Sequence, residues 1–171
     1  FEESFENIVH LASSNWTSNN LGGPGFQVIS NISSAGNKCV KLDNSQASDG
    51  DIDELISEPL DLSNLGSASF SFKYAFAKKN STNNDYLKVL ASNDCGKTWS
   101  VRKILQYSQL ATATNQINFI PKFSEWDEAS ISSIVGPYCV QNFRFKFEYQ
   151  SGGGNNLYID NINISYENTT S

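Results

Sequence analysis

The chain has 171 residues, the length of one ordinary domain and enough to bury a sizeable hydrophobic core. Its formal net charge is −6 and its pI is near 4.7, and no basic stripe offsets the acidic charge, so nucleic acid is disfavoured as a partner. It has no apolar run of about 18 residues, and we therefore expect no membrane insertion.

Hydrophobic alternation with a period of two recurs along the chain, whereas helical periodicity is weak. One short helical turn is expected within residues 124–133. The expected strands are, in chain order, residues 3–8, 26–30, 38–43, 55–57, 69–76, 86–92, 98–105, 116–121, 143–149 and 158–166.

Two of these strands are strongly amphipathic. Aromatic rings occupy every even position of residues 69–76, and rings alternate with charged residues over 143–149. Rings spaced by two residues lie on one face of a strand, and burying each ring stabilises the fold by about 1.5–3 kcal/mol. Nine or ten such strands predict an all-β, two-sheet antiparallel β-sandwich, a jelly roll.

The strand at residues 158–166 carries an acid in an apolar pattern. If Ile162 and Ile164 face the core, strict alternation places Asp160 on the same face. A buried carboxylate without a partner costs several kcal/mol. The partner is either a cation or a set of backbone N–H donors, and the sequence leaves both alternatives open.

Oxygen-rich residues elsewhere favour the cation. Asn44 shares a face with Val40, and the acid-dense loop at residues 49–54 follows it. Calcium takes six to eight oxygen ligands from carboxylates, amides and carbonyls. We therefore expect one structural Ca²⁺ that joins Asp160, this loop and an N-terminal acid such as Glu6.

Short motifs across nearly the whole chain also match a known pattern. They include Ser4-Phe5-Glu6, Asn15-Trp16-Thr17, the segments 55–63, 85–89 and 92–99, and the C-terminal segment 154–162. With these motifs in this order, the chain resembles MAM-like jelly-roll domains of secreted bacterial proteins, including gingipain-type cleaved-adhesin domains. It looks most like the domains that follow pappalysin-type metalloproteases in Bacteroidetes.

The resemblance implies a β-sandwich with a structural calcium whose ligands map to Glu6 and Asp160, with Asn44 and Asp53 as a looser assignment. It also implies export to the cell surface or the medium. Residues 18–23 lack the acidic loop that adhesin relatives often carry after the tryptophan, which makes a second metal site doubtful.

Aromatic residues in loops are candidate ligand contacts. Trp16, Trp126, Tyr107 and Tyr138 are expected to contact a glycan or a protein surface, because aromatic faces suit pyranose rings. The alternative is that Trp99 and Trp126 pack against the edges of the sandwich.

The three cysteines allow one internal disulfide. We expect Cys95–Cys139, because antiparallel pairing of the strands at 86–92 and 143–149 brings these residues to the same end of a sheet. Cys39 would then be free.

The chain contains neither HExxH nor GxSxG, and its single histidine, His10, is expected to be structural. We therefore expect no enzyme activity. The whole of residues 1–171 is interpreted as one accessory domain, excised from a larger exported protein, that binds a protein, a cell surface or a glycan and contacts neighbouring domains of its parent.

Overall fold

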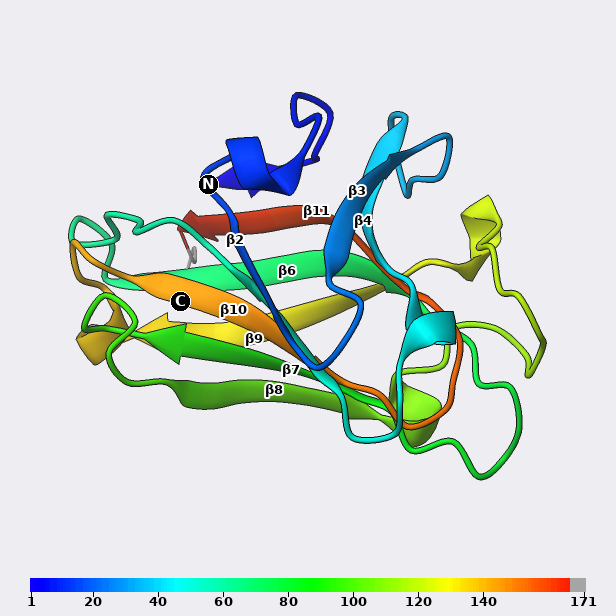
Figure 1. Ribbon diagram of the computed structural model, residues 1–171. Helices are drawn as coiled ribbons and strands as arrows, with labels where there is room; N and C mark the ends of the chain where they lie inside the picture. The colour runs from blue at the N-terminus through cyan, green and yellow to red at the C-terminus, as the bar shows by residue number, and fades with distance from the viewer. Residues whose placement is uncertain (167–171) are drawn as a thin grey trace.

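The computed structural model describes residues 1–166, apart from the side chains of Gln46 and Ser133. Within these residues, eleven strands form two antiparallel sheets that pack face to face (Figure 1). The predicted all-β, two-sheet jelly roll is confirmed. Helical structure in this part of the chain is limited to short 3₁₀ turns, and none of them is long and apolar enough to cross a membrane.

The first sheet, sheet A, has six strands in the order β3-β4-β11-β6-β9, with β1 paired to β11. These strands are β1 (Glu2–Glu3), β3 (Phe26–Ser30), β4 (Lys38–Leu42), β6 (Ser67–Ala75), β9 (Asp127–Val135) and β11 (Leu157–Tyr166). The second sheet, sheet B, has five strands in the order β2-β5-β10-β7-β8. They are β2 (Thr17–Leu21), β5 (Ile52–Ile56), β7 (Tyr86–Ser92), β8 (Ser100–Gln106) and β10 (Arg144–Gln150).

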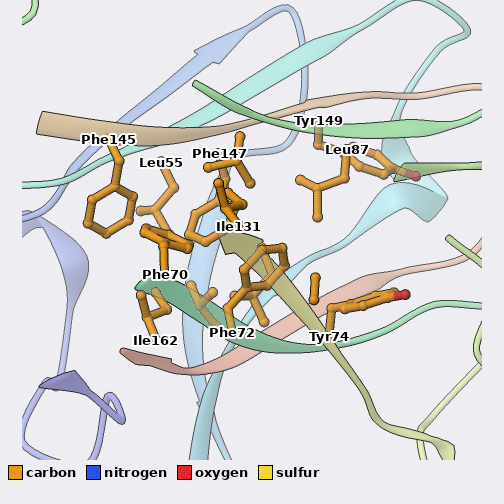
Figure 2. Close-up of a cluster of buried hydrophobic side chains, with 14 of the residues drawn as sticks. Leu55, Phe70, Phe72, Tyr74, Leu87, Ile131, Phe145, Phe147, Tyr149 and Ile162 are labelled. Carbon is orange, nitrogen blue, oxygen red and sulfur yellow. The ribbon is translucent and has the colours of Figure 1, made fainter. Parts of the chain in front are cut away.

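The core lies between the two sheets and is rich in aromatic rings (Figure 2). The rings of β6 meet those of β10: the centroids of Phe70 and Phe145 are 4.8 Å apart, and those of Phe72 and Phe147 are 5.0 Å apart. Both pairs have the edge-to-face geometry that aromatic quadrupoles favour. The two alternating runs therefore anchor the core as predicted.

Several element predictions were wrong. A helical turn was expected within residues 124–133, but the 3₁₀ turn covers only Phe123–Glu125, and Asp127–Val135 form the edge strand β9. Residues 116–121, expected as a strand, are irregular. The polar segment Thr17–Leu21, where no strand was expected, is β2. Edge strands have one unpaired side and little burial, so their sequences carry a weak alternation signal.

A β-bulge in β11 decides where Asp160 points. The pairing of β11 with β6 shifts register between Asp160 and Asn163, and Asn161 has φ 45°. The extra residue reverses the side to which the chain alternates. Ile159 and Ile162 therefore both lie in the inter-sheet core, while Asp160 lies on the outer face of sheet A. The expectation that Asp160 faces the core was wrong, although the residue is fully buried.

Candidate functional site

Asp160 is buried beneath the loop that joins β3 and β4. Its Oδ2 accepts hydrogen bonds from the backbone N–H of Ser34 at 2.8 Å and from Ser34 Oγ at 2.9 Å. Its Oδ1 accepts the N–H of Asn161 at 2.8 Å. Burial nevertheless raises the pKa of Asp160, because desolvation outweighs these donors.

Glu6 holds the other side of the same loop. Its Oε1 accepts the N–H groups of Asn37 and Lys38, both at 2.8 Å, and these bonds lower the pKa of Glu6. Gly36 has φ +80°, and a Cβ there would lie 2.5 Å from Glu6 Oε1, so the loop approaches this carboxylate too closely for any other residue. The structure thus brings Glu6 and Asp160 to one loop.

Asn44 and Asp53 lie elsewhere. Asn44 follows Leu42 at the end of β4 opposite the β3–β4 loop. The structure therefore does not bring the four predicted calcium ligands together. Among residues 1–166, no group of three or more His, Cys, Asp or Glu side chains is placed to hold a metal ion. Of the four, only Glu6 and Asp160 meet at one loop, and both accept backbone N–H groups there.

Asn44 belongs to a buried hydrogen-bond network. Its Nδ2 donates to Tyr149 Oη at 2.9 Å and to the carbonyl oxygen of Gly154 at 3.0 Å, and its Oδ1 accepts Ser151 Oγ at 2.6 Å. Asp85 Oδ1 accepts Tyr149 Oη at 3.1 Å. These side chains satisfy one another and join β4 and β10 to the glycine-rich loop at residues 152–154.

Asp53 holds the turn between β2 and β3. Its Oδ1 accepts the N–H of Gly25 at 2.8 Å, and a Cβ on Gly23 would lie only 1.9 Å from its Oδ2. Burial, and to a smaller extent the charge of Asp51, raise the pKa of Asp53. Asp53 thus fixes the turn that contains Gly23 and Gly25.

The four predicted aromatic contacts do not gather on one face. Trp16 is buried in the core against Phe145 and donates from Nε1 to Glu3 at 3.1 Å, so its prediction as a surface contact was wrong. Trp126 packs edge-on against Tyr158 on the outer face of sheet A. Tyr107 is exposed at the end of β8, and the half-buried Tyr138 stacks with Arg102.

The predicted disulfide is absent. All three cysteines are free thiols, although Asn93 Nδ2 donates to the carbonyl of Pro137 at 3.1 Å and the two cysteine-bearing loops therefore touch as expected. Cys95 is exposed in a turn with φ 62°, whereas the thiol of Cys139 donates to the carbonyl of Ile134. Strand pairing brings the two loops together without aligning the sulfurs.

The outer face of sheet B carries a ladder of paired charges. On β10, Lys146 and Glu148 alternate with core-facing rings, so both point away from the core. Lys146 pairs with the buried carboxylate of Glu54 and lies 3.9 Å from Glu148, which is 3.8 Å from Lys88. Each lysine therefore has a carboxylate partner, and the ladder is close to electrically neutral.

Aromatic rings flank this ladder. Lys146 Nζ lies 4.8 Å from the centroid of Trp99, and Lys88 Nζ lies 4.8 Å from the centroid of Tyr86. Both rings are half-buried. Tyr86 begins β7, and Trp99 lies in the turn between β7 and β8. Sequence reasoning assigned Trp99 to structural packing and missed this face, although the charges between the rings of 143–149 were a visible signal.

Comparison with known proteins gives a fold and no family. No family model and no curated protein matches the chain. Among solved structures, the K2 cleaved adhesin domain of Lys-gingipain is 17% identical, with 98% of each chain covered and a TM-score of 0.67. The chain thus has the cleaved-adhesin-type jelly-roll fold that its motifs indicated.

Carbohydrate-binding modules share this fold. The CBM27-1 module of Caldicellulosiruptor saccharolyticus, solved with mannohexaose, is 12% identical over 97% of this chain and 96% of its own, with a TM-score of 0.64. TmCBM61, solved with β-1,4-galactotriose, is 14% identical over 96% and 99%, with a TM-score of 0.59.

Proposed function

We propose that this chain is a non-catalytic, adhesion-type binding module of an exported multidomain protein, a metalloprotease by the resemblance of its motifs, and that it presents the outer face of sheet B to a neutral glycan. The observation that carries the proposal is the ladder of Lys146, Glu54 and Glu148 beside the ring of Trp99. Adhesin domains and carbohydrate-binding modules of the same fold support a binding role without catalysis.

The chemistry of the ladder favours a neutral, hydroxyl-rich ligand. Because each ladder lysine already has a carboxylate partner, a polyanion would gain little from either ammonium group. Ammonium and carboxylate groups held in place by their partners can instead donate to and accept from sugar hydroxyls. The half-buried rings of Trp99 and Tyr86 offer apolar faces to a pyranose ring.

Calorimetric titration tests this proposal with three probes, namely mannohexaose, β-1,4-galactotriose and xylohexaose. We expect binding of at least one probe, with Trp99→Ala weakening it by about tenfold or more because a stacking platform is lost. Tyr107→Ala is the matched control, since this ring is exposed but lies outside the ladder. Absence of binding by all three sugars, or an equal loss in both variants, would refute the proposal.

A structural calcium is part of the proposed function. Glu6 and Asp160 would hold it. The ion would supply positive charge between the segment that follows β1, strand β11 and the β3–β4 loop. Support comes from two carboxylates that hold one loop and from the burial of Asp160. The competing explanation is that N–H donors alone stabilise these carboxylates.

Thermal melting with Ca²⁺ and then EDTA separates the two explanations. The calcium proposal predicts a midpoint that rises with Ca²⁺ and falls with EDTA in the native chain, and a response that is lost in Glu6→Gln. Asp53→Asn is the control, because Asp53 lies at the distant glycine turn and should leave the response intact. A midpoint that changes with neither reagent would show that N–H donors alone stabilise the two carboxylates.

A further inference from the structure

The segment between β8 and β9 exposes large apolar side chains at its tip. Ile117 is 75% exposed, Ile120 is 63% exposed and Phe123 is 84% exposed. Three such residues within seven positions are unusual on a protein surface, where single exposed apolar residues are the norm. We call Ile117, Ile120 and Phe123 the apolar tip.

The backbone that carries the apolar tip is tightly held. Between its first two members, the ring of Phe119 is fully buried against Tyr158. The Phe119 N–H donates to Asn155 Oδ1 at 3.0 Å, and its carbonyl accepts Tyr158 Oη at 2.9 Å. Asn155 Nδ2 also donates to the carbonyl of Gln116 at 2.6 Å. The exposed side chains are therefore presented by a fixed loop whose central peptide groups are satisfied.

Lysines flank the apolar tip, although the whole chain has a net charge of −6. Lys122 lies between Ile120 and Phe123, and residues 117–124 contain no acid. The N–H of Gln116 donates to the carbonyl of Lys78 at 3.0 Å, which places Lys78 and the exposed Lys79 beside the start of the tip. Three acids follow the tip: the Oε2 of Glu125 accepts the N–H of Lys122, Glu128 pairs with Lys73, and Asp127 lies between them. Figure 1 shows both loops projecting at the same end of the sandwich, at the right of the view.

We propose that the apolar tip is a lipid-contacting surface that inserts shallowly into an anionic bilayer. Apolar side chains that protrude from a convex loop suit an acyl boundary, and lysines at their base suit acidic headgroups. Satisfied peptide groups matter here, because a bilayer offers no water to replace missing partners. Shallow insertion of side chains from a loop does not require a membrane-spanning helix.

Vesicle co-sedimentation tests the proposal with the whole chain. We expect binding to vesicles of phosphatidylcholine with about 30% phosphatidylserine, weaker binding to pure phosphatidylcholine, and a decrease with added salt. The combined variant Ile117→Ser, Ile120→Ser and Phe123→Ser should reduce partitioning by at least about tenfold. Lys79→Glu with Lys122→Glu should reduce binding to the acidic vesicles by a similar factor.

Matched controls come from equally exposed residues elsewhere. Val9 is 68% exposed and Leu21 is 62% exposed, so Val9→Ser and Leu21→Ser remove comparable apolar surface and should leave vesicle binding unchanged. Circular dichroism and melting of every variant confirm that the sandwich is intact. If the native chain does not co-sediment with the acidic vesicles, the proposal is overturned. If sedimentation analysis then finds self-association that the triple variant abolishes, the tip belongs to an interface between copies.

Discussion

The two outer faces of the sandwich differ in what covers them. On sheet A, a second cluster of Cys39, Ala75 and Tyr158 lies under the β8–β9 segment, with Phe119 as its cap, and the β3–β4 loop buries Asp160 nearby. On sheet B, Lys146 and Glu54 are buried beside the ring of Trp99, whereas Glu148 and Lys88 are partly exposed.

The difference separates structural polar groups from groups available to a ligand. Asp160 and the Tyr158 hydroxyl have their partners in loops that close over them, so they act by fixing those loops. Lys146 and Glu148 have their partners side by side on the sheet; Lys146 and Glu54 are buried, and the ladder reaches solvent at Glu148 and Lys88. Changes to the covered face should therefore affect stability, and changes to the open face should affect binding.

The largest expected effect is that of Asp160→Ala. The substitution leaves the Ser34 and Asn161 N–H groups without their acceptor in a buried place, and we expect a loss of about 2–4 kcal/mol in the free energy of unfolding. Urea denaturation measures it. A loss below about 0.5 kcal/mol, within the range of ordinary surface changes, would show that the loop is not held by this residue.

Tyr158→Phe should have a smaller effect on the same face. It removes only the hydroxyl that donates to the Phe119 carbonyl, which should cost about 1 kcal/mol while the ring packing remains. Hydrogen exchange of the β8–β9 segment should accelerate in parallel. If exchange accelerates equally throughout the sandwich, Tyr158 supports the whole fold and does not specifically hold this segment.

On the open face, replacing a whole ion pair should scarcely change stability. Lys146→Met combined with Glu54→Leu removes two largely buried charges together, and such replacements are often neutral or stabilising, so we expect a change within about 1 kcal/mol. Glycan binding should nevertheless be lost. A strongly destabilised double variant would contradict the assignment of this pair to ligand binding.

The smallest effect concerns pH. Hydrogen bonds from Thr98 and Ser92 lower the pKa of Asp94, in the β7–β8 turn, to about 2. Stability from this carboxylate is present above the unfolded pKa of about 3.9 and is lost as pH falls toward 2. Asp94→Asn should therefore reduce the loss of unfolding free energy between about pH 4 and pH 2, measured by urea denaturation at each pH. The raised pKa of Asp160 has the opposite sign, since its protonation favours the folded state.

The sequence predicts the fold well wherever aromatic alternation is strong. The runs at 69–76 and 143–149 identify β6 and β10, and the strands expected at 86–92 and 98–105 correspond to the hairpin of β7 and β8. These segments are central strands or a tight hairpin, so burial on one face fixes their pattern.

The candidate site is less predictable because it depends on local irregularity and on pairing between distant strands. The bulge at Asn161 places Asp160 on the outer face of sheet A, whereas strict alternation along β11 predicts the core face. The Lys146–Glu54 pair joins strands about 90 residues apart in sequence, and their register cannot be derived from either strand alone.

The most direct test is an NMR titration of the isotopically labelled chain with mannohexaose, β-1,4-galactotriose and xylohexaose. A glycan on the outer face of sheet B should shift the Trp99 indole signal and the amides around Lys88 and Lys146, while signals of the β3–β4 loop stay unchanged. Shifts that cluster on that loop or at the apolar tip, with Trp99 unaffected, would contradict the proposed binding face.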